Sequence, residues 1–103
     1  MLDYLFTYGT LQDLQVQKYI FGRVLDGKTD FLLGFKRLDN AVYERYSLVV
    51  QTKDFKNKVE GKVYRVTTLD LRKADVYETS AYKRKKVKLE SGIEAWLYIG
   101  NSH

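Results

Sequence analysis

The chain has 103 residues, 45% of them hydrophobic and 15% aromatic, and a formal charge of +5. This length and composition predict one globular domain over residues 1–103 rather than a disordered chain. Cysteine is absent, which excludes a disulfide framework, a thiolate zinc site and a cysteine nucleophile. His103 is the only histidine, so neither a histidine-based metal site nor a Ser-His-Asp triad is expected.

The N-terminus and the hydropathy pattern indicate where the protein resides. No apolar run approaches the ~20 residues of a membrane helix. The first residues include Asp3 and lack the basic segment and apolar stretch of a secretory signal. We therefore expect a cytoplasmic protein that does not associate with a membrane.

The elements predicted along the chain follow the order strand, helix, three strands, helix, two strands. Strands are expected at residues 2–8, 31–35, 41–51, 59–66, 82–90 and 93–99. The two helices are expected from Asp13 to about Phe21 and from the Thr67 region to about Glu78. Six strands in a small domain favour an α+β fold, a small mixed β-barrel with two short flanking helices.

Local signals mark the ends of several elements. Gly22 is a plausible stop for the first helix, and Asp70, three residues after Thr67, suits the start of the second. Gly34 lies inside an apolar segment and suggests a bulge or a tight barrel bend. Ser91-Gly92 is a candidate two-residue hairpin turn between the last two strands.

The basic run Lys83–Lys88 holds part of the positive charge. A solvated strand whose lysines keep the sheet soluble is the interpretation we favour. A nucleic-acid surface is the alternative, and it would bind with an affinity that falls steeply with salt. No recognised nucleic-acid-binding motif accompanies the run, so a nucleic-acid partner is not expected.

The second helix carries the acids of greatest interest. Helical spacing puts Leu71, Ala74, Asp75 and Glu78 on one face. Two carboxylates beside apolar groups can raise each other's pKa, and a Glu with a raised pKa can act as a general acid and base near neutrality. From spacing alone, acids on a solvated surface are the more common arrangement.

Short motifs along nearly the whole chain resemble those of the gamma-glutamyl cyclotransferase-like family, in the family's order. The four-residue YGTL match alone is weak, but together with D-x-Y-E-x3-Y-x-R it is specific. The matching segments are Leu5–Leu11, Gly34-Phe35, Val59–Tyr64, Asp75–Glu78, Tyr82–Arg84 and Ala95–Tyr98.

The resemblance implies a small mixed barrel and a reaction in which a gamma-glutamyl amide closes to 5-oxoproline and releases an amine. The substrate's own amine is the nucleophile, so no cofactor or metal is implied. Glu78 matches the family's catalytic glutamate and would be the acid/base. The gamma-glutamyl part of this small-molecule substrate would be held by Tyr8, Gly9, Thr10 and Leu11. The hydroxyl of Tyr82 would be a hydrogen-bonding partner near the pocket.

Two departures from the family pattern lie next to the proposed acid. Ala74 stands where the family usually has Leu, and Thr79 where it has Gly. A left-handed turn costs more with Thr than with Gly, so the path of the chain after Glu78 is expected to differ from that of the family.

A second interpretation of the whole chain also stays open, namely a non-catalytic module that binds a gamma-glutamyl or other carboxylate metabolite. The sequence gives no indication of oligomeric state or of the amine half of the substrate.

Overall fold

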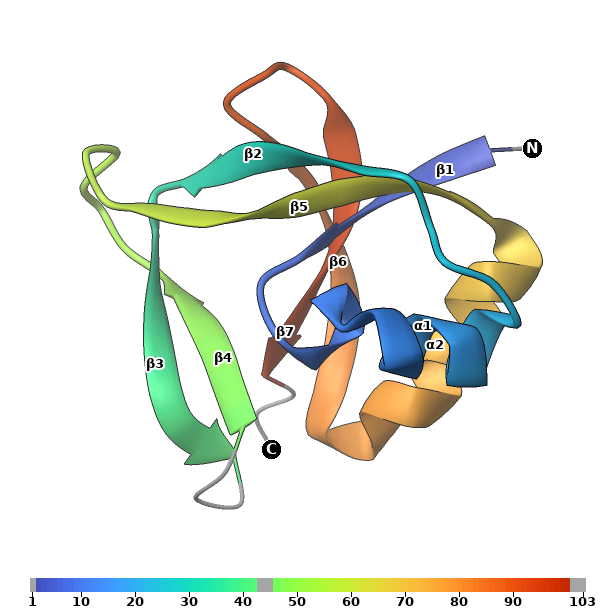
Figure 1. The fold of residues 1–103 in the computed structure, drawn as a ribbon. Coiled ribbons are helices and arrows are strands. Elements are labelled where there is room, and N and C mark those ends of the chain that lie inside the picture. The colour runs from blue at the N-terminus through green and yellow to red at the C-terminus, as the bar shows by residue number, and fades with distance from the viewer. Residues whose placement is uncertain (1, 43–45, 101–103) are drawn as a thin grey trace.

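A computed structural model describes residues 2–42 and 46–100. These residues form a mixed α+β fold with seven strands in two sheets and two α-helices (Figure 1). The elements are β1 (Leu2–Thr7), α1 (Leu14–Phe21), β2 (Gly27–Leu33), β3 (Phe35–Val42), β4 (Tyr46–Gln51), β5 (Lys58–Thr67), α2 (Thr68–Glu78), β6 (Tyr82–Lys88) and β7 (Glu94–Gly100). Short 3-10 turns at Thr10–Gln12 and Thr79–Ala81 precede α1 and follow α2.

The larger sheet has the strand order β2-β5-β1-β7-β6, and β3 and β4 form a separate two-stranded hairpin. All neighbours in the larger sheet are antiparallel except β1 and β7, which are parallel. Figure 1 shows α1 and α2 side by side, while the β3–β4 hairpin projects from the opposite end of the sheet. The chain after β1 therefore lies between the helices and the hairpin.

Alternation along β1 divides the core into two clusters. Phe6 is buried with residues of the hairpin, including Phe35 and Val49. Leu5 points to the other face and is buried with α2 residues, including Leu71. Burying an apolar side chain of this size contributes about 1.5–3 kcal/mol, so both faces of β1 hold it in place. The end of β1 is consequently a rigid support for the residues that follow it.

The α+β class is confirmed, but the six-stranded barrel is not. Gly34 has a φ of +77°, and the apolar segment around it divides there into β2 and β3, which belong to different sheets. A positive φ is readily adopted by glycine, so the residue makes a sharp turn between two sheets rather than the expected bulge or bend within a barrel. The described strands form two sheets and no closed barrel.

The predicted strand over 41–51 is also divided. β3 ends at Val42 and β4 begins at Tyr46, and residues 43–45 lie outside the described part of the chain. The register of the hairpin shifts between Leu38 and Val42. The prediction of a single strand over residues 41–51 was therefore wrong, because β3 and β4 run in opposite directions.

The helix boundaries follow the predicted signals. Gly22 ends α1 with a φ of +75°, and its N–H donates to the carbonyl of Lys18. Thr67 and Asp70 form a reciprocal capping box at the start of α2, each side chain accepting the other residue's backbone N–H. No helix in residues 2–42 and 46–100 combines the length and apolar character that crossing a membrane requires.

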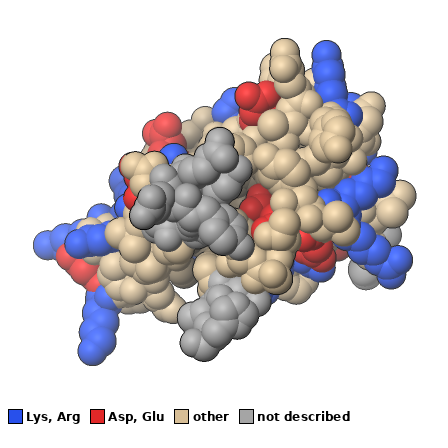
Figure 2. All heavy atoms as spheres, turned by 90° about the horizontal axis from the view of Figure 1, so that it is seen from below, with Lys and Arg blue, Asp and Glu red and all other residues tan. Residues whose placement is uncertain are grey.

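The basic run forms β6 at the edge of the larger sheet. Arg84 and Lys86 lie over the ring of Trp96, at 4.7 and 5.3 Å from its centroid. On the face shown in Figure 2, Lys and Arg side chains project mainly at the periphery, with Asp and Glu among them. The absence of a nucleic-acid partner remains a prediction.

Candidate active site

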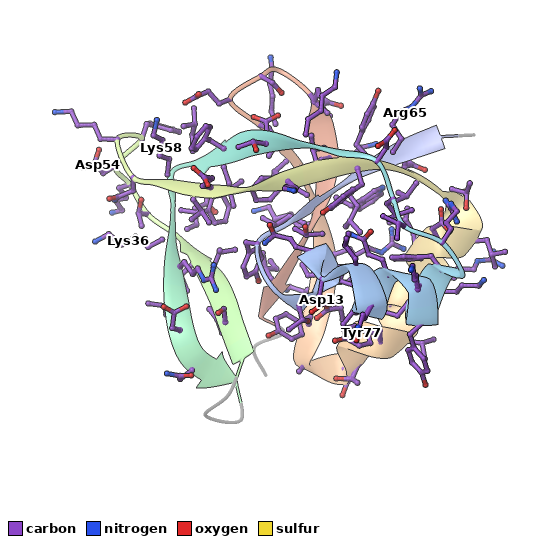
Figure 3. The ribbon with its side chains drawn as sticks, viewed as in Figure 1. Asp13, Lys36, Asp54, Lys58, Arg65 and Tyr77 are labelled. Carbon is purple, nitrogen blue, oxygen red and sulfur yellow. The ribbon has the colours of Figure 1, made fainter. Side chains whose placement is uncertain are left out.

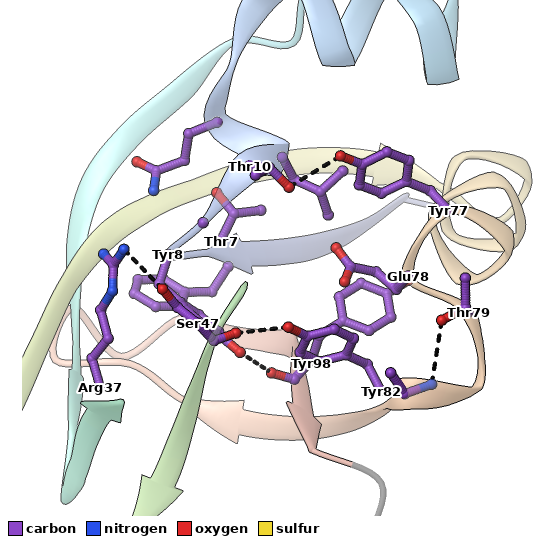
Figure 4. Close-up of a pocket in the computed structure, with 15 residues that line it drawn as sticks. Thr7, Tyr8, Thr10, Arg37, Ser47, Tyr77, Glu78, Thr79, Tyr82 and Tyr98 are labelled. Atoms are coloured by element: carbon purple, nitrogen blue, oxygen red, sulfur yellow. Dashed lines mark hydrogen bonds between the residues drawn. The ribbon is translucent and has the colours of Figure 1, made fainter. Parts of the chain in front are cut away.

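A pocket of about 830 Å³ opens between the chain after β1, the C-terminal end of α2 and the β3–β4 hairpin (Figure 4). This volume lies within the range of roughly 300–1,000 Å³ typical of small-molecule sites. The pocket brings together all six residues that the sequence predicted for the site. Its lining residues are Phe6, Thr7, Tyr8, Gly9, Thr10, Leu11, Gln12, Arg37, Ser47, Tyr77, Glu78, Thr79, Ala81, Tyr82 and Tyr98.

The chain after β1 forms a short turn whose residues line this pocket. A 3-10 turn follows Gly9, with the N–H of Gln12 donating to the Gly9 carbonyl at 3.1 Å and that of Asp13 to the Thr10 carbonyl at 3.0 Å. A 3-10 turn bonds from residue i to i+3, so the N–H groups of Thr10 and Leu11 have no acceptor within the turn. These two N–H groups are suited to an anion or a carbonyl oxygen that becomes negative.

Buried contacts fix the path of this segment. The side chain of Gln17 is fully buried, and its Nε2 donates to the Leu11 carbonyl at 2.8 Å while its Oε1 accepts from the N–H of Leu25 at 2.9 Å. On β5, a Cβ added to Gly61 would lie 2.2 Å from the carbonyl oxygen of Thr7, a contact that no side chain can make. Gly61, which lies in the family-like segment Val59–Tyr64, therefore allows β5 to approach the end of β1 closely.

Tyr8 and Thr10 contribute differently to the pocket. Tyr8 is buried, its hydroxyl donates to the Tyr98 carbonyl at 2.8 Å, and burial raises its pKa above the usual range. Its ring is therefore a wall of the pocket. The Thr10 hydroxyl lies 3.1 Å from the hydroxyl of Tyr77, which links the loop to α2. Tyr77 was not predicted as a site residue.

Glu78 is the last residue of α2 and lies in the pocket opposite the hairpin (Figure 4). Burial raises the pKa of its carboxyl from 4.5 to about 7. Among the residues that the structure describes, no side chain or N–H group hydrogen bonds to this carboxyl. A carboxyl in this state can both accept and return a proton near neutral pH.

Asp75 does not raise the pKa of Glu78 as the shared helix face suggested. Its carboxylate accepts from Arg84 Nε at 2.7 Å and Nη2 at 3.1 Å, and from the Tyr98 hydroxyl at 2.7 Å. The paired charge of Arg84 neutralises Asp75, and burial alone accounts for the shift at Glu78.

Thr79, directly after Glu78, adopts a positive φ, although the cost of such a conformation for Thr led us to expect a different path. Its φ is +62° and its ψ is −170°, a combination adopted almost only by glycine. For a β-branched residue such a conformation costs on the order of 1–3 kcal/mol. The turn that closes the pocket after Glu78 is therefore strained.

The hairpin supplies residues that the sequence did not identify. Tyr82 donates its hydroxyl to the Ser47 carbonyl at 2.7 Å, which ties β6 to β4. Arg37 Nη2 donates to the Ser47 hydroxyl at 3.1 Å, and Arg37 Nε donates to Asp39 at 2.9 Å. One signal was available, because Arg37 is two residues from buried Phe35 and so shares its face of β3.

The described residues contain no cluster of three or more Asp, Glu, His or Cys side chains able to hold a metal ion. Glu78 and Arg37 are the two charged side chains among the described lining residues. The site thus combines one carboxyl of raised pKa, backbone N–H groups and one guanidinium. This set is suited to proton transfer and to binding an anionic group.

Solved structures of similar fold come from plants, animals, bacteria and an archaeon. Two solution structures of Arabidopsis thaliana proteins match with TM-scores of 0.84 and 0.81 at 24% and 26% identity, covering 98% and 99% of this chain. The chain spans 63% and 72% of the length of those two proteins. An AIG2-like protein from Mus musculus matches with a TM-score of 0.66 at 21% identity, over 99% of this chain and 79% of that one.

Comparison at the level of sequence families is more specific. No curated protein matches the chain. The family model described as "Gamma-glutamyl cyclotransferase, AIG2-like" matches residues 5–103, which include every segment on which the resemblance was based. The chain therefore belongs to the AIG2-like gamma-glutamyl cyclotransferase family.

Proposed function

We propose that the protein is a gamma-glutamyl cyclotransferase that converts a gamma-glutamyl amide to 5-oxoproline and a free amine. The observation that supports this most directly is the position of Glu78. Its half-buried carboxyl, with a pKa of about 7, lines the same pocket as Thr10 and Leu11. Family membership supplies the reaction class.

The substrate's α-amino group is the nucleophile in this proposal. Ionised Glu78 accepts one proton from the α-ammonium group, and the freed amine attacks the gamma-carbonyl carbon. Because both groups belong to one molecule, correct folding of the substrate can be worth roughly 7–11 kcal/mol. The residues Tyr8, Gly9, Thr10 and Leu11 hold the gamma-glutamyl part in this folded form, and Tyr82 borders it.

Ring closure leaves an oxyanion on the former carbonyl, which the N–H groups of Thr10 and Leu11 stabilise. Protonated Glu78 then gives its proton to the nitrogen of the leaving amine, and the bond between this nitrogen and the carbonyl carbon breaks. The ring nitrogen sheds its remaining extra proton through solvent, and the released amine takes up one. Protons balance, and Glu78 returns to its ionised form.

The test is a screen of gamma-glutamyl amides in which 5-oxoproline is measured. We expect release of 5-oxoproline by the natural sequence and a loss of about 10²–10⁴-fold in Glu78→Gln. Glu60→Gln, the same change at an exposed position on β5, is the matched control and should be fully active. Thermal unfolding of both variants checks that the fold is intact.

Two results would contradict the proposal. Turnover by Glu78→Gln at the natural rate would remove Glu78 as the acid/base. Stabilisation by gamma-glutamyl compounds without any 5-oxoproline would favour the binding module instead.

A further inference from the structure

Arg37 lies across the pocket from Glu78, on the hairpin wall (Figure 4). It is the one cationic side chain among the described lining residues, and Glu78 is the one acidic side chain. Near neutral pH Glu78 is partly protonated, so the guanidinium is the more constant charge. The hairpin wall is therefore suited to a negatively charged part of a ligand.

Two hydrogen bonds hold this guanidinium in a fixed orientation. Nε donates to Asp39 and Nη2 donates to the hydroxyl of Ser47, which in turn donates to Asp39 at 3.0 Å. Nη1 has no hydrogen-bond partner within residues 2–42 and 46–100. Held in this way, the side chain loses little rotamer freedom when it binds a ligand.

Asp39 does not cancel this charge inside the pocket. Its side chain is 69% exposed, compared with 43% for Arg37, and it does not line the pocket. An ion pair at such exposure is screened by solvent and contributes little. A ligand carboxylate bound in the pocket would displace water from this wall and could accept a charge-assisted hydrogen bond from Arg37.

The position of Arg37 relative to the scissile bond decides which part of the substrate it contacts. The gamma-glutamyl part lies on the Tyr8–Leu11 loop, and the scissile nitrogen must lie near Glu78 to receive its proton. The substituent on that nitrogen then extends into the rest of the pocket, which Arg37, Ser47 and Tyr82 line. A cationic polyamine in this place would be repelled by the guanidinium.

We propose that Arg37 is a specificity-determining residue that binds a carboxylate carried by the leaving amine. The preferred substrates are then gamma-glutamyl amides of amino acids or peptides rather than of simple amines or polyamines. This inference rests on the proposed cyclotransferase function.

Two substrates that differ only by the carboxylate test this. Gamma-glutamylalanine and gamma-glutamylethylamide have the same scissile bond, because ethylamine is alanine without its carboxylate. We expect kcat/KM for 5-oxoproline release to be about 10–100-fold higher for gamma-glutamylalanine. Arg37→Gln should remove this preference by raising KM for gamma-glutamylalanine about 10–100-fold more than for gamma-glutamylethylamide.

Two further variants test whether the preference depends on the positive charge alone, on the planar shape of the guanidinium, or on the position of the charge at residue 37. Arg37→Lys keeps the charge without the planar fork and should restore part of the preference. Lys36→Gln makes the same charge change on the neighbouring residue, which points outward from the hairpin (Figure 3), and should leave the preference intact. Loss of the preference in Lys36→Gln would show a general charge effect and overturn the proposal.

Three other results would also overturn the proposal: no preference in the natural sequence, an equal loss for both substrates in Arg37→Gln, or a lowered kcat with unchanged KM. If neither substrate is turned over, the cyclotransferase function fails on its own, and calorimetric binding of the same two compounds decides the role of Arg37. Tighter binding of gamma-glutamylalanine that disappears in Arg37→Gln supports the carboxylate subsite, and equal binding contradicts it.

Discussion

The two ends of α2 each carry a carboxyl, buried at Asp70 and half-buried at Glu78, and the two behave in opposite ways. Asp70, in the first turn, is 4% exposed and accepts from Arg23 Nη1 at 2.9 Å and Nη2 at 2.6 Å, and from the N–H of Thr67 at 2.9 Å. The hydrogen bonds from Arg23 lower its pKa, against the effect of burial. Glu78, in the last turn, has no such donors among the described residues, and burial raises its pKa to about 7.

The comparison shows that burial alone does not decide what a carboxyl does. Donors at the N-terminal end of the helix stabilise the ionised form of Asp70, and the helix dipole acts in the same direction. At the C-terminal end the dipole disfavours a negative charge, in the same direction as burial. At the start of α2 the ion pair of Asp70 stabilises the fold, and at the end of α2 the carboxyl of Glu78 can exchange a proton near neutral pH.

The largest expected effect that separates the two ends is on the pH dependence of activity. Ionised Glu78 is required as the base, so kcat/KM should fall about tenfold per unit as the pH drops below about 7, or ~100-fold by pH 5. Initial rates of 5-oxoproline release between pH 5 and 9, with stability checked at each pH, measure this. A rate that is flat from pH 5 to 8 would contradict the role of Glu78.

The second prediction concerns the stability supplied by Asp70. Asp70→Asn should lower the free energy of unfolding by about 1–3 kcal/mol at pH 7, because a neutral amide at this buried position accepts more weakly from half-exposed Arg23 and from the Thr67 N–H. The control is Asp13→Asn at the exposed cap of α1, which should stay within about 0.5 kcal/mol because Asn also caps helices.

The pKa of Asp70 also fixes the sign of its pH dependence. Its folded pKa is lowered, so its contribution is present above the unfolded pKa of about 3.9 and is lost as the pH falls through the folded pKa. The difference between the natural sequence and Asp70→Asn should therefore shrink on acidification. Urea unfolding at pH 7 and pH 3 tests this, and an effect that grows at low pH would contradict it.

The third prediction is that Glu78→Gln stabilises the fold at high pH. The folded pKa of Glu78 is raised from 4.5 to about 7, so the natural sequence loses stability as the pH rises through this window. Each pKa unit corresponds to about 1.4 kcal/mol, which gives at most about 3 kcal/mol above pH 8. Urea unfolding at pH 8 and pH 4 measures it: the variant should be more stable at pH 8 and equal at pH 4.

The smallest expected effect is at the strained turn after Glu78. Thr79→Gly should raise the free energy of unfolding by about 1 kcal/mol, because glycine adopts a φ of +62° without strain. Ser80→Gly is the control, since the φ of Ser80 is not positive and glycine there should be neutral or destabilising. Thermal unfolding compares them, and destabilisation by Thr79→Gly would mean that the threonine side chain supports the turn.

The lining of the pocket was predictable where short-range sequence signals and family motifs coincide. Tyr8, Gly9, Thr10, Leu11, Glu78 and Tyr82 all line one pocket, although they come from three separate segments. The start of α2 at Thr67 and the end of α1 at Gly22 were also predictable, because residues within one helical turn determine them. Arg37 and Ser47 were missed because β3 and β4 reach the pocket only through the turn at Gly34.

The sequence by itself determined the α+β class, both helix ends, the family and the identity of the candidate acid. These depend on periodicity, on local capping and on motif spacing, which act over a few residues. Only the tertiary structure decided the division of the strands into two sheets, the pairing of Asp75 with Arg84, and the placing of Arg37 opposite Glu78. The physical reason is that burial and ion pairing depend on which distant segments meet, and that is settled only when the chain packs.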